Sequence, residues 1–138
     1  MGDEIFSKVE RKVSYDQNQE LLRPFESFEV KEAVFSMHPD KSPGPDGLNP
    51  GFYQAYWDIV GSNVSAACLH YLNNCVLPSD LNATSIILIP KVKLPERITD
   101  LRPIALCNVI YKIMAKVLAN RLKKVLPGVI SESQSAFI

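Results

Sequence analysis

Apolar side chains repeat at three- and four-residue spacing through the first half of the chain, which predicts helices. Val30, Val34 and Met37 fall on one face of a short helix that begins near Ser27 and ends before His38-Pro39. Residues 39–47 contain three prolines and two glycines. We therefore expect a structured loop after this helix.

Two further helices are expected between this loop and Pro78. Pro50 suits the first turn of one of them, and Gly61 is expected to separate it from the next. The first carries an aromatic stripe and the second a buried face at helical spacing. The stripe comprises Phe52, Tyr53, Tyr56, Trp57 and Val60, and the buried face comprises Val64, Ala67, Cys68, Tyr71, Leu72 and Cys75.

The pattern changes to extended structure after Pro78. Residues 83–90 form a short, β-branched run bounded by proline, which favours a buried strand over a helix. Residues 101–106 predict a second strand or an extended turn. Together the two segments indicate a hairpin with a long, basic tip.

The best-defined helical pattern runs from Asn108 to Leu126. Its apolar arc comprises Ile110, Ile113, Met114, Val117, Leu118, Leu122 and Val125. Lys112, Lys116 and Lys123 project within about 40° of one another on the other side, because each helical residue turns by about 100°. Arg121 falls within the apolar arc, where an unpaired guanidinium is costly. It therefore needs an acceptor or an escape to the helix end.

The two ends of the chain depart from this pattern. Residues 1–26 are polar and poorly periodic, so we expect a flexible or partly helical lead-in before the main domain over residues 27–138. Near the other end, Ser131 and Gln134 have the spacing of a capping box. A helix that starts there has fewer than two turns before Ile138, which is typical of an element that continues further. The order of elements indicates a piece of an α+β protein.

The net charge of zero hides an asymmetry along the chain. Residues 1–80 carry 6 basic and 12 acidic side chains, whereas residues 81–138 carry 9 basic and 3 acidic ones. The basic portion favours a polyanionic partner such as nucleic acid, and mutual neutralisation within one fold is the alternative. No apolar run approaches the roughly 18 residues of a membrane span, and the start does not resemble a signal peptide. We expect a nuclear or cytoplasmic protein that is not secreted and does not bind membranes.

Candidates for catalysis are few. Two-metal phosphoryl transfer needs converging carboxylates, but Asp40 and Asp46 lie in the loop, where turn geometry alone favours Asp. Neither a GxxxxGK[ST] nor a GxGxxG phosphate loop occurs. Cys68, Cys75 and Cys107 lack metal-ligand spacing and are expected to be buried thiols. We therefore predict no catalytic and no metal-binding residue in this chain.

Cationic residues are the stronger signal. Lys91 follows the first strand directly, and Arg102 lies at the start of the second extended segment. A hairpin holds these two side chains near each other over one surface, where they suit a triphosphate. Merely solvated strand ends are the alternative.

A series of segments, taken together, resembles a known family. They are Lys41-Ser-Pro-Gly-Pro-Asp-Gly47, the aromatic helix, Ile86-Ile-Leu-Ile-Pro-Lys91, Asp100-Leu-Arg-Pro-Ile-Ala-Leu-Cys-Asn-Val109, Tyr111-Lys112-Ile113, Leu118-Ala-Asn-Arg-Leu-Lys123 and Gln134-Ser-Ala-Phe137. In order and spacing they resemble the reverse transcriptases of non-LTR (LINE-type) retrotransposons, most of all plant members. The resemblance implies the helix-rich fingers portion of a right-hand polymerase, with a short β-hairpin and an incomplete palm.

The resemblance also assigns roles to individual residues. Lys91 and Arg102 match the family's basic fingers residues, which contact the triphosphate of the incoming nucleotide. Lys112, Lys116 and Lys123 lie on a helix that resembles the one beside the template path, and a solvated helix face is the alternative. Gln134 belongs to an element near the templating base.

The resemblance further implies what the chain lacks. The family's first metal-binding Asp and its Tyr-Ala-Asp-Asp turn lie downstream of the Gln134 element. The intact enzyme uses Mg²⁺, a dNTP and an RNA/DNA template-primer, whereas this chain is expected to bind no metal, to be inactive alone and to bind nucleic acid weakly and without sequence preference. Without the palm, the strand edge over residues 86–89 is expected to be exposed. A non-catalytic interaction or nucleic-acid-binding module, with the remainder of the polymerase as one candidate partner, is the alternative.

Overall fold

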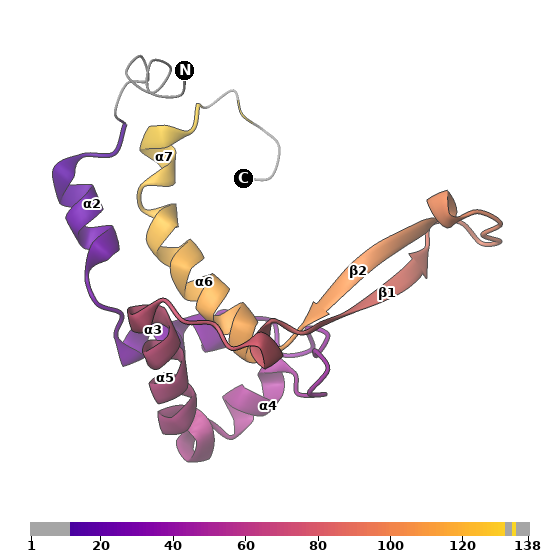
Figure 1. Cartoon of the computed structure of the whole chain (residues 1–138), viewed down its shortest axis with the longest axis horizontal. Coiled ribbons are helices and arrows are strands. Elements are labelled where there is room, and N and C mark those ends of the chain that lie inside the picture. The colour runs from indigo at the N-terminus through magenta and orange to yellow at the C-terminus, as the bar shows by residue number, and fades with distance from the viewer. Residues whose placement is uncertain (1–11, 132–133, 135–138) are drawn as a thin grey trace. The chain divides into compact units, whose positions relative to one another are not determined.

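The computed structural model describes residues 12–131 and 134 (Figure 1). It is an α+β structure with one two-stranded antiparallel sheet, which confirms the expected fold class. Its elements are α2 (Tyr15–Leu22), α3 (Ser27–Phe35), α4 (Pro50–Ala55), α5 (Trp57–Asn74), η1 (Ser79–Asn82), β1 (Thr84–Pro90), η2 (Ile98–Asp100), β2 (Leu101–Cys107), α6 (Val109–Lys123) and α7 (Leu126–Val129). No helix in the described ranges is long and apolar enough to cross a membrane.

The chain divides into two compact units. The larger spans Phe25–Val117 and holds α3, α4, α5, the hairpin and the first part of α6. The smaller consists of the described residues before Phe25 and after Val117, with α2, the last part of α6 and α7. The single helix α6 thus contributes to both units.

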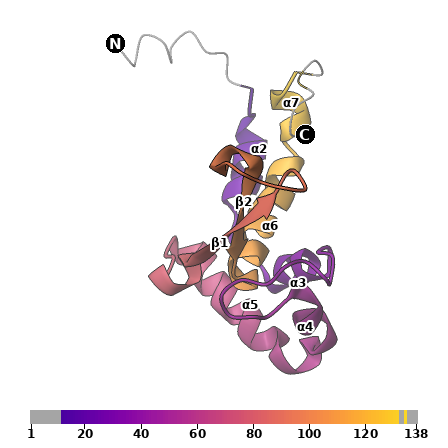
Figure 2. The same ribbon diagram turned by 90° about the vertical axis from the view of Figure 1, so that its right-hand side faces the viewer.

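The core of the larger unit lies where α3, α4 and α5 gather around the start of α6 (Figure 2). Val30 and Val34 are fully buried and Met37 is 8% exposed, so the predicted apolar face of α3 is confirmed. From α6, the predicted core residues Ile113, Met114 and Val117 join them. The buried cluster comprises Val30, Ala33, Val34, Met37, Tyr53, Val64, Cys68, Val109, Ile113, Met114 and Val117.

The boundary between α4 and α5 differs from the prediction. The side chain of Asn49 accepts a backbone N–H of the first turn of α4 at 2.9 Å, and Pro50 occupies that turn as expected. The break lies at Tyr56 and not at Gly61, which is inside α5. A Cβ at Gly61 would lie 2.6 Å from Cε2 of Trp57. The glycine therefore makes room for an indole ring one turn earlier and does not end a helix.

The end of α5 corrects the prediction for the cysteines. Cys75 is the C-terminal cap of α5 with φ 53°, and its side chain is exposed. A left-handed residue ends the helical path, so its side chain leaves the buried face. Cys68 is fully buried as expected, whereas Cys107 is half-buried. Among the three thiols, only that of Cys68 therefore fits the expectation.

The hairpin is confirmed, but the expected burial of its first strand is not. Thr84 lies opposite Cys107 and Pro90 opposite Leu101, in antiparallel register. All seven residues of β1 are exposed, and Figure 1 shows the hairpin projecting away from the helices of its unit. A strand is buried only when another layer covers its faces, and the described sheet has no third strand. This exposure agrees with the expectation that the edge over residues 86–89 is uncovered.

The smaller unit contains a helix within the lead-in. A capping box starts α2: the N–H of Gln17 donates to Oγ of Ser14 at 3.1 Å, and Ser14 N–H donates back to the Gln17 side chain at 2.9 Å. Of the two states expected for residues 1–26, the helical one therefore applies to Tyr15–Leu22.

Arg121 finds the acceptors that its position in α6 requires. It is only 6% exposed, and its guanidinium donates to the backbone carbonyls of Leu21, Arg23 and Pro24. Leu118 and Leu122, expected in the apolar arc, are instead 45% and 48% exposed. In this unit, Arg121 lies on the side of α6 that faces α2. Leu118 and Leu122 are therefore not part of a buried apolar face here.

Candidate functional site

The hairpin brings Lys91 and Arg102 to one face. Ile89 lies directly opposite Arg102, and the N–H of Lys91 donates to the carbonyl of Asp100 at 2.7 Å, which continues the pairing by one step. Alternate residues of a strand point to the same side, so the register places Lys91 and Arg102 on one side as diagonal neighbours. Both side chains are exposed. The juxtaposition expected from the sequence is therefore present.

Polar bonds within the tip hold Lys91 and the turn beside it in place. The Nζ of Lys91 donates to the carbonyl of Thr99 at 2.8 Å. The carboxylate of Asp100 accepts the N–H groups of Glu96 and Arg97 at 3.2 and 3.0 Å, and this closes the short turn η2. The tip thus has a defined conformation built from neighbouring residues.

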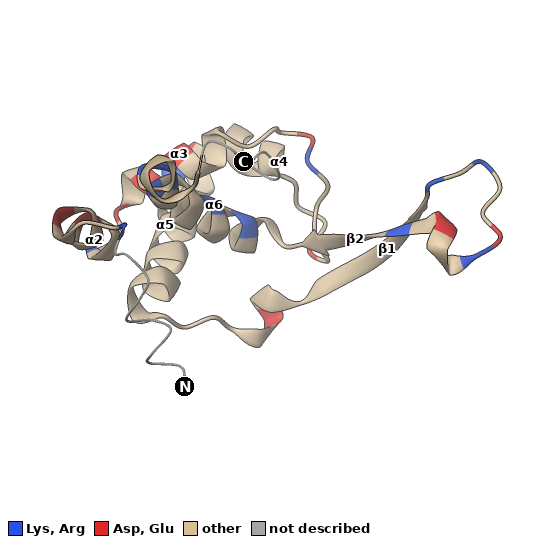
Figure 3. Cartoon of the chain, turned by 90° about the horizontal axis from the view of Figure 1, so that it is seen from above, with Lys and Arg blue, Asp and Glu red and all other residues tan. Residues whose placement is uncertain are grey.

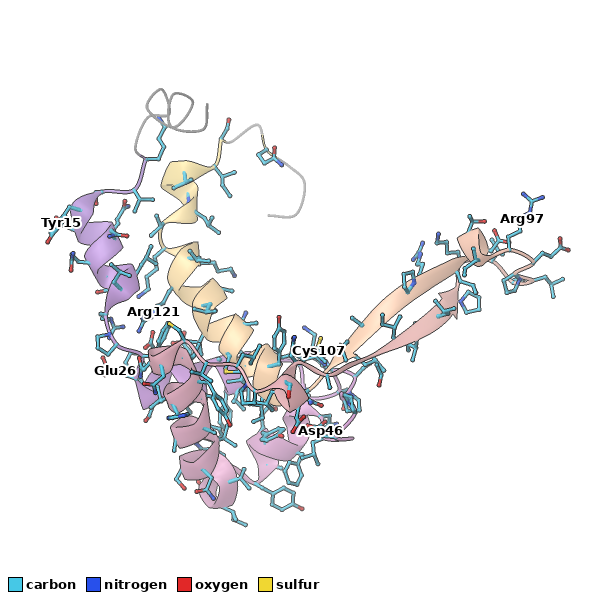
Figure 4. The ribbon with its side chains drawn as sticks, in the orientation of Figure 1. Tyr15, Glu26, Asp46, Arg97, Cys107 and Arg121 are labelled. Atoms are coloured by element: carbon cyan, nitrogen blue, oxygen red, sulfur yellow. The ribbon has the colours of Figure 1, made fainter. Side chains whose placement is uncertain are left out.

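Two further cations lie on the basic tip that the sequence predicts, although neither is among the predicted site residues. Lys93 and Arg97 are both exposed, and Figure 4 shows Arg97 at the end of the hairpin away from Cys107. Residues 91–102 carry four basic and two acidic side chains, and Figure 3 shows these charges alternating around the tip. The excess of basic over acidic residues in the segment between the two strands was the available signal for Lys93 and Arg97.

The loop of residues 39–47 packs on the junction between β2 and α6. A Cβ at Gly44 would collide with the backbone N of Asn108 and lie 2.5 Å from the carbonyl carbon of Cys107, so only glycine fits this approach. The N–H of Asp46 donates to Oδ1 of Asn108 at 3.4 Å. The Nζ of Lys112, which lies on α6, donates to the carbonyl of Ser42 in this loop at 2.7 Å. The loop is therefore held to the start of α6.

Within this loop the carboxylate of Asp46 serves turn geometry, as the sequence predicts. The carboxylate of Asp46 accepts the N–H of Leu48 at 3.2 Å, and Gly47 follows with φ 72°. The N–H of Asp40 is bonded to the ring of His38 at 3.3 Å. Asp46 also opposes the ionisation of Tyr53: burial, and then the charges of Asp46 and Cys68, raise the pKa of the Tyr53 hydroxyl.

The predicted nucleic-acid residues have different surroundings. Lys112 is half-buried and bonded to the loop, and Lys116, one turn further, is also half-buried. Lys123 is exposed at the end of α6 in the smaller unit. Gln134 is exposed, and its N–H donates to the carbonyl of Ser131 at 2.9 Å. The rest of the predicted capping-box helix, with Ser135 and Phe137, lies outside the described residues.

Asn108 is a site residue that the sequence analysis did not select. It is 8% exposed; its Oδ1 accepts from Asp46, and its Nδ2 donates to the carbonyl of Asp80 at 3.4 Å. One amide side chain thus joins the loop, the turn η1 before β1 and the start of α6. Its position between a strand and a helix was the available signal, because an Asn there is typically a cap.

No metal site is formed in the described part of the chain. No group of three or more His, Cys, Asp or Glu side chains there is placed to hold an ion. Burial raises the pKa of the Cys68 thiol to about 12, which keeps it protonated and unreactive at neutral pH. The carboxylates in the described part of the chain therefore do not gather into a ligand set for Mg²⁺.

Comparison with known proteins gives one informative similarity. No protein-family model matches the chain. It is 34% identical over 123 residues to the Transposon TX1 uncharacterized 149 kDa protein of Xenopus laevis. The match covers 89% of this chain but only 9% of that protein's length. The chain is thus a sequence relative of one segment of a transposon-encoded protein, in agreement with the retrotransposon origin that its motifs imply.

Proposed function

We propose that this chain is the fingers portion, with the entrance to the palm, of an RNA-directed DNA polymerase from a non-LTR (LINE-type) retrotransposon. The similarity to a transposon protein supports the origin, and the order of motifs supports the enzyme class. The observation that carries the proposal is the hairpin register, in which Lys91 and Arg102 share one exposed face. The plant likeness stays a prediction, since the relative is from Xenopus laevis.

In this proposal, Lys91 and Arg102 bind the triphosphate of an incoming dNTP. A guanidinium offers a planar fork to two phosphate oxygens, whereas an ammonium is a mobile point charge. The bond from Lys91 to the Thr99 carbonyl is to a neutral acceptor at an exposed position, so a phosphate competes with it favourably. Lys93 and Arg97 on the same tip add to the local positive charge.

The proposed contacts to the template are electrostatic. Lys112, Lys116, Lys123 and Gln134 contact the nucleic-acid backbone, which gives weak binding without sequence preference. Lys112 already donates to Ser42, so its part is first to hold the loop beside α6. Lys116 and Lys123 then supply most of the phosphate neutralisation.

The catalytic metal chemistry belongs to the rest of the polymerase in this proposal. Mg²⁺ held by converging carboxylates would stabilise the transferring phosphoryl group, and the described residues provide no such carboxylate set. The chain alone is therefore proposed to be inactive. Its partners are the template-primer, a dNTP and the remainder of the polymerase, in the nucleus or cytoplasm, with no role at a membrane.

A nucleotide titration tests the proposal. The 138-residue chain is titrated with a fluorescent dNTP, and Arg102→Gln and Lys91→Gln are compared with Lys31→Gln. The control removes the same charge from an exposed position on α3. We expect each hairpin variant to weaken binding by on the order of tenfold, and the control to leave it unchanged. Equal weakening by all three variants, or no binding by the wild type, contradicts the proposed site.

The second candidate function is a non-catalytic interaction module derived from such an element. The exposed apolar hairpin favours it, because strands of this composition are normally covered by a partner. A chain that binds no dNTP but binds a protein or RNA through the hairpin would support this candidate over the first.

A further inference from the structure

The two edges of the hairpin differ in their capacity to accept another strand. Along a strand, successive N–H groups point alternately toward and away from the paired strand. The N–H of Lys91 points inward, to the carbonyl of Asp100. By alternation, the N–H groups of Thr84, Ile86 and Leu88 point outward from β1. This edge therefore offers three donors in a row.

Proline blocks the other edge. Pro103 lies opposite Leu88, so its nitrogen occupies an outward position of β2, and it has no hydrogen to donate. It interrupts the outer edge of β2 near the middle of the strand, which is a common protection against strand addition. In β1 the corresponding proline, Pro90, is the last residue. The open edge of the sheet is therefore that of β1.

The side chains along this edge lack the usual protection. Ile86 and Leu88 on one face are 68% and 51% exposed, and Ile87 and Ile89 on the other are 41% and 44% exposed. No charged residue occurs between Thr84 and Pro90. An uncharged, apolar strand with three successive outward donors is a template for another strand of the same kind.

We propose that the outer edge of β1 pairs with the same edge of a second copy, antiparallel and with its two-fold axis at Ile87. This register places Ile86 opposite Leu88 of the second copy, and both residues have outward N–H and C=O groups. The two hairpins then form one four-stranded sheet, and Pro103 closes each of its outer edges. The pairing is independent of the reverse-transcriptase assignment.

Charge selects this orientation. In the two-fold register, Lys91 of one copy lies opposite Ala83 of the other. The cationic tip of each hairpin therefore approaches the start of β1 in the other copy, which follows the exposed Asp80. Parallel pairing would instead bring Lys91 and Lys93 against the same residues of the second copy. Figure 1 shows the hairpin extending from the helices of its unit, and all residues of β1 are exposed, which leaves its edge accessible.

Disulfide trapping tests the register. Ile87→Cys is introduced into a chain in which Cys75 and Cys107 are replaced by serine. In the proposed pairing the two introduced cysteines face each other as a non-hydrogen-bonded pair with Cα atoms about 4.5 Å apart, a separation that a disulfide bridges. Ser85→Cys is the control, because in the proposed pairing the introduced cysteines of the two chains are offset by about four residues along the strands, or roughly 13 Å. Dimer formation at position 87 but not at 85 supports the proposal, and equal trapping at both overturns it.

A pair of proline variants tests the edge itself by sedimentation velocity of the full chain over a concentration series. Leu88→Pro removes an outward donor from β1, and Ala105→Pro removes the equivalent donor from β2. We expect Leu88→Pro to raise the dimer dissociation constant by roughly tenfold or more and Ala105→Pro to leave it unchanged. Ile86→Lys, which keeps the backbone donors, is expected to abolish association even if Leu88→Pro disturbs the hairpin. A wild type that stays monomeric, or equal effects of both prolines, overturns the proposal.

Discussion

The guanidinium of Arg121 donates to the backbone carbonyl of Pro24 at 2.9 Å, across 97 residues of sequence. The same group also donates to the carbonyls of Leu21, at 3.1 Å, and Arg23. These carbonyls lie at and just after the end of α2, where helical acceptors lack an intrahelical donor. One buried cation therefore terminates a helix formed by residues far away in the sequence.

Replacement of Arg121 should release α2. In Arg121→Met the three carbonyls lose a charged donor, and we expect a loss of about 2 kcal/mol in the local stability of α2. Hydrogen exchange of the amides of residues 18–22 measures this directly. Lys124→Met, at an exposed position near the same helix, is the control. Unchanged protection of α2 in Arg121→Met would show that the helix is held by other contacts.

Gly44 should tolerate no side chain. In Gly44→Ala the new Cβ would lie 2.5 Å from the carbonyl carbon of Cys107 and 2.6 Å from Cα of Asn108, so the loop or the start of α6 has to move. We expect a loss of about 1–3 kcal/mol in denaturant unfolding, the usual range for overpacking. Gly128→Ala is the matched control, since its Cβ would meet no described atom within 4 Å beyond its chain neighbours and its own helix backbone. Equal stabilities of the two variants would contradict the close approach.

Replacement of Asn108 by aspartate should destabilise the folded chain. Asn108→Asp removes the donor to Asp80 and places a carboxylate near that carbonyl in a site that is 8% exposed. We expect a loss of about 1–3 kcal/mol at neutral pH that is partly recovered at low pH, where the carboxyl is protonated. Urea unfolding at neutral and at mildly acidic pH measures both. A variant with wild-type stability at neutral pH would remove the amide from its bridging role.

The pattern of the sequence predicts the parts of this fold that depend on local periodicity. The buried face of α3, the start of α4 at Pro50 and the hairpin follow from the spacing of side chains. The need of Arg121 for an acceptor also follows, because burial of an unpaired guanidinium is costly. The identity of the acceptors does not follow, since they belong to a segment with weak periodicity.

Contacts between distant segments explain what the sequence analysis missed. Gly61 looks like a helix break until the ring of Trp57 is placed over it. β1 has the composition of a buried strand, but burial depends on a covering layer that no local pattern reports. Likewise, the role of Asn108 requires that the loop and η1 arrive at the same place.

Thiol chemistry should distinguish the cysteines. Burial raises the pKa of Cys68 from its ordinary value of 9.0 to about 12, so its thiol stays neutral in the folded chain. The unfolded chain releases this proton above a pH of about 9, so the contribution to stability is complete below that pH and is lost as pH rises toward 12. Cys68→Ala should flatten the fall in stability over this window. At mildly alkaline pH a thiol reagent should modify Cys75 in the native chain before Cys68, and the reverse order would contradict the burial.

The lysines of α6 should differ in their contributions to RNA binding. Neutralisation of about three phosphates on a single strand gives a slope of about −2 when the logarithm of the binding constant is plotted against that of the salt concentration. The wild type should therefore lose affinity modestly between low and physiological salt. Lys112→Gln, Lys116→Gln and Lys123→Gln together should reduce both the affinity and the slope.

Single variants in the same titration separate phosphate contact from loop support. Lys112 donates to the carbonyl of Ser42, so Lys112→Gln should reduce stability, while Lys116→Gln and Lys123→Gln should reduce the salt slope more. Lys31→Gln on α3 is the control for net charge alone. If the triple variant binds RNA as tightly as the wild type at both salt concentrations, the helix has no part in binding. The basic portion of the chain would then serve to neutralise the acidic one.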